Sequence, residues 1–401
     1  MPQLASHLGR LSSESALEVF ARARELERAG RSIIHLELGE PEFYPTPPVI
    51  AAASEALAAG RDRYGPSEGI LALREAVAEY LARTRNLHYR LENVLIAPGC
   101  KMALLMCLLA VIEAGSEVLY PDPGFPMYAS VTQGLGAVPV PYRLLEANRF
   151  QPDVNEIASK ISPRTRVLLL NSPGNPTGTV YERPVLEALA DLARRHDLWV
   201  VSDEIYARII YGGAYESIAA LPGMAERTLV VDGFSKSFGM TGWRLGYAVA
   251  PPSVISALTL LVINSYSCVP DFLQCGAIEA LRDTQGAVAA TVAEFSRRRA
   301  SFVAALNLIP GFRCRPPDGA FYAWINIEDT GLDSAAICRI LLKDAGVAGI
   351  PGESFGAAGQ GFIRFSFAGA AAQLDEAIRR IESLAPAWQQ LRAAGAHARE
   401  P

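Results

Sequence analysis

The middle of the chain, from Pro48 to about Val249, alternates short apolar runs with longer amphipathic stretches. Helices are expected over residues 49–59, 69–83, 101–113, 125–133 and 183–196. Strands are expected over residues 94–97, 117–120, 137–142, 166–171, 199–203, 228–232 and 245–250. Strands that alternate with helices of this length are joined by crossovers, and the runs 167–170 and 199–201 are apolar without alternation. The pattern therefore predicts an α/β fold, with a mostly parallel sheet covered by helices on both faces.

Both ends of the chain have a different pattern. An amphipathic helix is expected over residues 13–29 and a first strand over 33–38. After a long helical region at 272–308, strands are expected over 320–327, 347–350 and 362–367, and helices over 334–345 and 373–384. We expect both ends to form one smaller α+β domain, with residues 1–46 and 291–401 flanking a large domain of residues 47–290. Residues 393–401 are expected to be a frayed tail.

Composition narrows the class of protein. The chain has 401 residues, half of them hydrophobic, which is enough for one large domain and a smaller one. Its 37 basic and 42 acidic side chains give a net charge of -5, which argues against a nucleic-acid partner. The apolar run 257–263 is far shorter than the roughly 20 residues of a membrane-spanning helix, and residues 1–10 lack the apolar core of a signal peptide. We therefore expect neither membrane insertion nor export.

The six cysteines are scattered singly along the chain. No two of them have the CxxC spacing that is typical of zinc or redox sites, so no metal site is expected. The cysteines therefore indicate reduced thiols in a cytoplasmic protein.

A lysine follows one of the strands expected to be buried. Lys236 stands between Ser235 and Ser237, and Arg244 follows eight residues later. An amine in this place can form an imine with a carbonyl compound, and an arginine offers a planar fork of donors that fits a phosphate. Taken alone, Lys236 would more often be an ordinary solvated lysine, so its interpretation depends on companion motifs.

Four other segments carry such companion motifs. They are the turn 171–178 with Asn175, the strand end with Asp203 and Tyr206, the helix start at Gly99, and the tail strand with Arg364. The amides and the dipole of a helix start suit a phosphate. Each motif also has an ordinary structural alternative: a Pro/Gly-rich turn, a helix cap, a helix start with nothing bound, or a structural ion pair. Their occurrence together, in this order, is much more specific than any one of them.

With the segments 36–43, 63–66 and 69–74, these motifs resemble those of the class I and II aminotransferases, a family of fold type I pyridoxal-phosphate enzymes. The resemblance runs from about Leu17 to Leu384 and so covers nearly the whole chain. It implies a large domain that binds pyridoxal 5'-phosphate, a smaller domain from both termini, and a homodimer. It also implies an enzyme that moves an amino group between an L-amino acid and a 2-oxo acid.

The resemblance implies a role for individual residues. Lys236 would bind the cofactor covalently, Asp203 would pair with its pyridine nitrogen, and Phe125 would stack on its ring. Tyr206 and Asn175 would donate to its phenolic oxygen. Its phosphate would be held by Gly99, the backbone amides of Cys100 and Lys101, Ser235, Arg244 and, from a second subunit, Tyr64. The substrate carboxylate would be bound by Arg364, near Asn175, Phe125 and Gly39.

The chemistry of these side chains fits the implied roles. A carboxylate at Asp203 keeps the pyridine nitrogen protonated, so that the ring can accept the electrons left when the Cα proton departs. The planar fork of Arg364 matches a carboxylate. The amine of Lys236, once the substrate displaces it, can carry a proton as a general acid and base.

Three positions depart from the family pattern. Phe125 stands where many relatives have Trp, Gly233 where Ser is frequent, and Cys100 where Ala, Gly or Ser is usual. No arginine can be assigned to a second, distal carboxylate of a substrate. Lys101 could bind such a group, or it could be a solvated lysine in the first turn of its helix. We expect an aspartate-type or broad-specificity enzyme with 2-oxoglutarate as the acceptor.

Alternative functions remain open at this point. The same cofactor motifs serve β-elimination, decarboxylation, ring-forming synthase reactions and oxidation by O2. The segment 352–356 matches the GxSxG nucleophile elbow around Ser354, and Asp375 and His397 follow in hydrolase order, although no strand is predicted near His397. A cofactor-sensing transcription regulator would need a DNA-binding module, and residues 1–46 lack a helix-turn-helix with a basic face.

Overall fold

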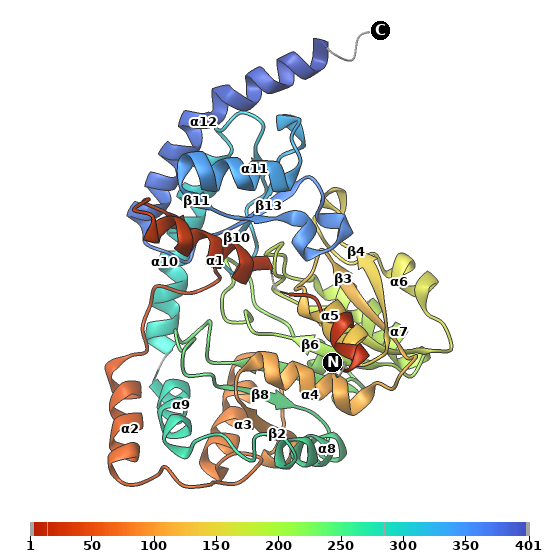
Figure 1. Ribbon diagram of the computed structural model, residues 1–401. Coiled ribbons are helices and arrows are strands. Elements are labelled where there is room, and N and C mark those ends of the chain that lie inside the picture. The colour runs from red at the N-terminus through yellow and green to blue at the C-terminus, as the bar shows by residue number, and fades with distance from the viewer. Residues whose placement is uncertain (1–3, 14, 284, 398–401) are drawn as a thin grey trace.

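The computed structural model describes residues 4–13, 15–283 and 285–397, and it is built around a seven-stranded sheet (Figure 1). The order of the strands is β2-β8-β7-β6-β5-β3-β4. Their bounds are β2 Val94–Ala97, β3 Glu117–Asp122, β4 Val138–Arg143, β5 Thr165–Asn171, β6 Trp199–Asp203, β7 Thr228–Gly233 and β8 Gly246–Val249. The pairs from β7 to β4 are parallel, whereas β8 is antiparallel to both of its neighbours. The expected mostly parallel sheet is confirmed.

Helices cover both faces of this sheet. They are α2 Pro47–Ala58, α3 Leu71–Arg85, α4 Cys100–Val111, α5 Met127–Gly134, α6 Val154–Lys160, α7 Arg183–Arg195, α8 Pro252–Ile263 and α9 Asp271–Asp283. Successive strand residues pack on opposite faces: Val201 packs in one core cluster with residues of α4 and α8, and Val200 packs in another with residues of α7. The apolar runs therefore lack alternation because both faces are buried.

The two ends of the chain meet in a second, smaller part. There β1 (Ile34–His35) pairs in parallel with β11 (Val347–Ala348), and a four-stranded sheet has the order β12-β13-β10-β9. Its strands are β9 Arg313–Cys314, β10 Tyr322–Asn326, β12 Ile350–Pro351 and β13 Phe362–Ser366, and the helices are α1 Ser15–Arg28, α10 Gln285–Leu306, α11 Ser334–Ile340 and α12 Ala371–His397. A π-helical turn, Leu341–Ala345, continues α11. The domain boundaries at 46 and 290 stay a prediction, and residue 290 lies inside α10.

Short 3-10 helices complete the secondary structure of the described ranges. They are Ser6–Arg10, Leu91–Asn93, Glu146–Asn148, Ile218–Ala220, Glu328–Thr330, Gly352–Phe355 and Ala357–Gly359. Among the described residues, no helix combines the length and the apolar character needed to cross a membrane.

The expected long helical region is confirmed, and it consists of two helices, α9 and α10. Two local expectations were wrong. The strand expected over 33–38 is only two residues long, because the chain beyond His35 leads into residues 38–40, which line a cavity at the end of the central strands. The tail expected to fray from residue 393 is helical to His397, since Trp388 anchors α12 by stacking on Phe312 at 5.7 Å, and residues 398–401 lie outside the described ranges.

Candidate active site

A cavity of about 380 Å³ lies where the central strands end. Parallel strands place their carboxyl ends at one edge of a sheet, and here β5 ends at Asn171, β6 at Asp203, and β7 two residues before Ser235. The smaller part closes the cavity with residues such as Gly39, Tyr322 and Arg364. The volume falls in the range of roughly 300–1,000 Å³ that is typical of pockets for small molecules.

The structure brings almost all of the predicted site residues together in this cavity. Its lining includes Gly39, Cys100, Lys101, Phe125, Asn175, Asp203, Tyr206, Ser235, Lys236, Arg244 and Arg364. Gly99 adjoins the lining residues Cys100 and Arg244, since a Cβ atom at Gly99 would come within 2.5 Å of the Arg244 guanidinium. Tyr64 lies outside, between α2 and α3, with 91% of its surface exposed.

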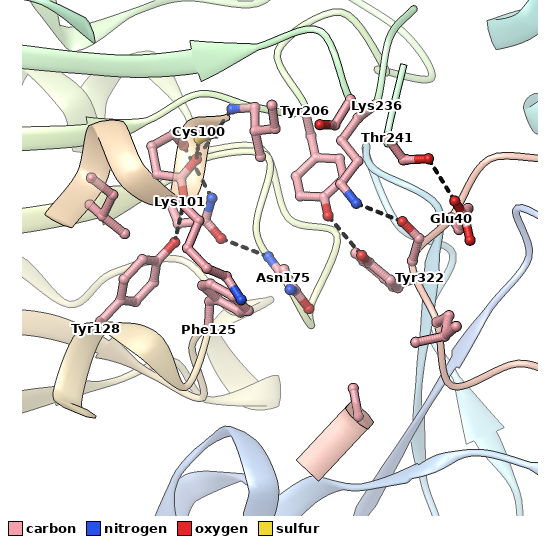
Figure 2. Close-up of a pocket in the computed structure, with 18 of the residues that line it drawn as sticks. Glu40, Cys100, Lys101, Phe125, Tyr128, Asn175, Tyr206, Lys236, Thr241 and Tyr322 are labelled. Atoms are coloured by element: carbon pink, nitrogen blue, oxygen red, sulfur yellow. Dashed lines mark hydrogen bonds between the residues drawn. The ribbon is translucent and has the colours of Figure 1, made fainter. Parts of the chain in front are cut away.

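Lys236 points its amine into the cavity (Figure 2). Its Nζ donates a hydrogen bond to the carbonyl oxygen of Gly39 at 2.6 Å. Burial, and next the positive charge of Arg364, lower the pKa of Lys236 to about 8. A substantial fraction of the amine is therefore neutral near pH 8, which is the form that attacks a carbonyl group.

Asp203 is a buried carboxylate at the end of β6. The hydroxyl of Tyr128 donates to its Oδ2 at 2.8 Å, and the thiol of Cys100 lies 3.8 Å from its Oδ1. Burial raises the pKa of Asp203 to about 6, and it also raises the pKa of the Cys100 thiol, which stays protonated. A buried carboxylate of this kind is stabilised by a cation, so it fits a protonated pyridine nitrogen.

The sequence analysis did not identify Tyr128 as a residue of the site. It lies three residues after Phe125, close to the start of α5, and the two rings pack edge to face at 5.7 Å. That spacing puts two side chains on the same side of a helical turn, and it was the one available signal. The hydroxyl of Tyr128 holds Asp203 in place.

One end of the cavity is suited to a phosphate. Helix α4 starts at Cys100, after Gly99 with a φ of +90°, and its first two residues line the same cavity as Ser235 and Arg244. The backbone amides of a helix start and a guanidinium are both strong ligands for a phosphate. Gly233 cannot carry a side chain here, because a Cβ atom would come within 2.9 Å of the Cα atom of Gly246 on the adjacent strand β8.

Arg364 provides the positive charge at another part of the cavity. Its Nη1 donates to Asn175 Oδ1 at 2.9 Å and its Nη2 to the carbonyl oxygen of Glu37, while its Cζ lies 4.4 Å from the centre of the Tyr322 ring. Because Asn175 uses its side-chain oxygen as an acceptor for Arg364, its Nδ2 group is the donor that remains for a ligand. Asn175 thus connects the place proposed for a substrate carboxylate with the place proposed for a phenolic oxygen.

Tyr206 and Lys101 complete the candidate site. The hydroxyls of Tyr206 and Tyr322 lie 2.7 Å apart. Tyr322 is a second residue that the sequence did not reveal, since no motif around it signals a function.

The amine of Lys101 lies 5.3 Å from the centre of the Phe125 ring, so the lysine lines the cavity, although the residue as a whole is exposed (Figure 2).

The GxSxG segment does not form a nucleophile elbow. Ser354 lies in the 3-10 helix Gly352–Phe355, which follows the two-residue strand β12 and leads into another 3-10 helix. An elbow needs a sharp turn from a strand into an α-helix. The hydrolase interpretation therefore has no support from the local backbone.

Lys236, the Asp203 carboxylate and the start of α4 thus lie together at one edge of the sheet, an arrangement that fits a fold type I pyridoxal-phosphate enzyme. Comparisons with known proteins are more specific, because residues 31–381 match the model of the family described as aminotransferase class I and II. The chain is 40% identical to the aspartate aminotransferase of Pyrococcus abyssi over 358 residues, which are 88% of this chain and 92% of that protein. It is 38% identical to aromatic-amino-acid aminotransferase 2 of Thermococcus litoralis, covering 95% and 98% of the two chains.

Solved structures agree with the sequence relatives. The aspartate aminotransferase of Thermus thermophilus with maleate has a TM-score of 0.91 to this chain at 36% identity, and the match covers 96% of this chain and all of that one. The chain therefore belongs to the class I and II aminotransferase family, whose members depend on pyridoxal phosphate. It is an aminotransferase, acting on amino acids and 2-oxo acids.

Proposed function

We propose that this aminotransferase uses an acidic L-amino acid, or a broad range that includes one, as donor and 2-oxoglutarate as acceptor. The lining of the cavity includes the cations of Lys101, Lys236, Arg244 and Arg364. Lys236 and Arg244 are assigned to the cofactor and its phosphate, which leaves the buried Arg364 and Lys101 for the substrate. This pair of cations is the observation that carries the proposal. Two cations can bind the two carboxylates of an acidic substrate. Relatives named for aspartate and for aromatic amino acids are compatible with either form of the proposal.

Pyridoxal phosphate bound at this site would supply the electron sink that lets the Cα proton leave. The side chains of the chain then have distinct tasks. Arg364 binds and orients the substrate carboxylate, and Asn175 holds Arg364 in place through the hydrogen bond at 2.9 Å. The Nζ atom of Lys236 would carry the proton between the substrate Cα and the C4' carbon of the cofactor, and the negative charge of Asp203 would keep the ring nitrogen protonated.

Lys101→Gln is expected to raise KM for aspartate about 10-fold or more, because a charge-assisted hydrogen bond to the distal carboxylate is lost. KM for alanine, which lacks that carboxylate, should change little. The measurement is a panel of amino donors scored by conversion of the bound cofactor to its pyridoxamine form. Lys343→Gln, at an exposed position, is the matched control. If aspartate and alanine lost affinity equally, Lys101 would have no role in selecting the substrate.

We also propose that the protein is a homodimer in which Tyr64 contributes to the phosphate site of the partner. Tyr64 is 91% exposed in its own subunit, in the segment between α2 and α3. Helices α2, α3 and α8 lie at one end of the molecule (Figure 1), and each carries exposed large apolar side chains. They are Ile50 and Leu57 on α2, Leu71 on α3, and Leu260 and Ile263 on α8. Exposed large apolar side chains that gather at one end of a molecule are typical of a subunit interface.

Subunit hybrids test this proposal. Lys236→Ala and Tyr64→Ala homodimers should each be impaired, whereas mixed dimers should regain one intact site, which combines Lys236 of one subunit with Tyr64 of the other. The measurement is activity after the two variants are unfolded together and refolded. If the mixture were no more active than its parts, Tyr64 would not act across an interface.

A cytoplasmic location is proposed as well. All six cysteines are unpaired, which is typical of proteins in a reducing compartment. Cell fractionation tests the location, and recovery in an exported fraction would contradict it.

A further inference from the structure

Tyr322 contacts three separate parts of the candidate site. Its hydroxyl lies 2.7 Å from the hydroxyl of Tyr206, and the face of its ring lies 4.4 Å from the guanidinium carbon of Arg364. It also fills the space next to Gly39, where a Cβ atom would come within 1.9 Å of the Tyr322 hydroxyl. The carbonyl oxygen of the same Gly39 accepts the hydrogen bond from Lys236. Figure 2 shows Tyr322 between Tyr206 and the segment of Glu40.

The surroundings of Tyr322 hold its ring in one position. The residue is 2% exposed and belongs to β10, which pairs with the Arg364 strand β13 over five residues. The rings of Tyr206 and Phe321 pack against it at 5.7 and 5.1 Å. A side chain enclosed in this way presents both its hydroxyl and its ring face at fixed places.

The hydroxyl of Tyr322 has a defined task if Tyr206 binds a ligand. A phenol has one proton to donate, so a Tyr206 hydroxyl that donates to a ligand oxygen must be the acceptor in its contact with Tyr322. Tyr322 is then the donor, and its hydrogen bond makes Tyr206 a stronger donor because neighbouring hydrogen bonds polarise one another.

The ring of Tyr322 has a second task. The guanidinium of Arg364 lies between the faces of Tyr322 and Phe355, at 4.4 and 4.8 Å. Cation–π contacts of this kind fix the plane of a guanidinium, and a carboxylate is bound in that plane.

We propose that Tyr322 is a positioning residue whose hydroxyl supports Tyr206 and whose ring orients Arg364, so that one side chain serves both the cofactor and the substrate. The proposal rests on the proposed function in one respect, namely that Tyr206 faces the cofactor's phenolic oxygen and Arg364 the substrate carboxylate. The two tasks can be separated by mutation, because one needs the hydroxyl and the other only the ring.

Tyr322→Phe removes the hydroxyl and keeps the ring. In the holoenzyme without substrate, we expect the pH midpoint at which the bound cofactor changes its absorbance to rise by about 0.5–1 unit, because the phenolic oxygen loses support. Affinity for succinate, a carboxylate that cannot react, should stay within about twofold of wild type. The substitution leaves in place the groups whose charges act most strongly on Lys236, which are Arg364, Glu40, Cys100 and Arg244, and the other titratable groups of the cavity, Lys101, Asp203 and Tyr206.

Tyr322→Leu removes the ring as well. It should show the same shift of the midpoint and, in addition, a 3- to 10-fold loss of affinity for succinate, as the cation–π contact disappears. If the leucine variant does not fold, Tyr322→Met fills a similar volume without an aromatic face and takes its place. Tyr206→Phe should shift the midpoint too, and adding Tyr322→Phe to it should have no further effect, since the second hydroxyl acts through the first.

Tyr211→Phe is the matched control. Tyr211 donates to a backbone carbonyl, Ala320, and its ring lies 4.7 Å from the Arg299 guanidinium, so it makes the same two kinds of contact outside the cavity. Loss of the Tyr211 hydroxyl should change neither the pH midpoint of the cofactor absorbance nor the affinity for succinate. An unshifted midpoint in Tyr322→Phe, or a loss of succinate affinity that is the same in the Phe and Leu variants, would overturn the proposal. Failure of the wild-type protein to bind pyridoxal phosphate would instead overturn the proposed function.

Discussion

Lys236→Ala is expected to lower the turnover number by about 10⁴-fold, because the variant loses the amine that we propose holds the cofactor and moves the Cα proton. The protein should stay folded. A truncation at this position leaves space in a cavity that already exists, and it removes an amine whose burial is unfavourable, as its pKa of about 8 indicates. Unfolding by denaturant and amino transfer at saturating substrate are the two measurements.

Reduction with borohydride identifies the amine directly. The chain has only four lysines, Lys101, Lys160, Lys236 and Lys343, so peptide mapping by mass spectrometry can assign the attached pyridoxyl group without ambiguity. We expect it on Lys236 in the wild type and in Lys343→Ala, which controls for a change at an exposed lysine. A pyridoxyl group found on another lysine of the wild type would contradict the assignment.

Asp203→Asn is expected to have the second-largest effect, a fall in turnover of about 10²–10³-fold. The amide keeps the size of the side chain and can still accept from Tyr128, but it carries no charge to keep a pyridine nitrogen protonated. The control is Asp122→Asn, at a carboxylate that is also buried, at the end of β3, but does not line the cavity. Equal turnover of wild type and Asp203→Asn would remove Asp203 from the catalytic account.

The same substitution should have the opposite effect on stability. Burial raises the pKa of Asp203 from 3.8 to about 6, so at neutral pH the ionised carboxylate opposes folding of the cofactor-free protein. One pKa unit corresponds to 1.36 kcal/mol, so Asp203→Asn should increase the free energy of unfolding at pH 7 by up to about 3 kcal/mol. The gain should shrink as the pH falls from 6 towards 4, where the native carboxyl takes up its proton. Urea unfolding at pH 7 and pH 4 measures it, and destabilisation at pH 7 would contradict the account.

Much of the fold was predictable because its main cause is local. The unbroken apolar runs of β5 and β6 follow from burial on both faces, and their predicted bounds differ from the observed ones by at most one residue. The short first strand was not predictable, since residues 38–40, which follow it closely, line a cavity that other segments create. The continuation of α12 depends on Trp388 packing against Phe312, a contact between distant parts of the chain.

The residues of the candidate site show the same difference between features with local causes and features that depend on distant parts of the chain. Residues in motifs, such as Lys236 and Asp203, were accessible from the sequence, because strand ends in a parallel sheet meet at one edge. Tyr322 was not, since its place beside Tyr206 and Arg364 depends on the pairing of β10 with β13. The sequence also left the direction of the Lys101 side chain open, because its position over the Phe125 ring in the cavity depends on how α4 and the segment of Phe125 meet in the fold.

The fate of the substrate nitrogen tests the central claim most directly. The holoenzyme is incubated with L-aspartate carrying an isotopically labelled amino nitrogen and with 2-oxoglutarate, and the products are identified by mass spectrometry. Amino transfer predicts labelled glutamate and an equal amount of the 2-oxo acid derived from aspartate, with no free ammonia. Labelled ammonia, or hydrogen peroxide formed without consumption of 2-oxoglutarate, would contradict the account.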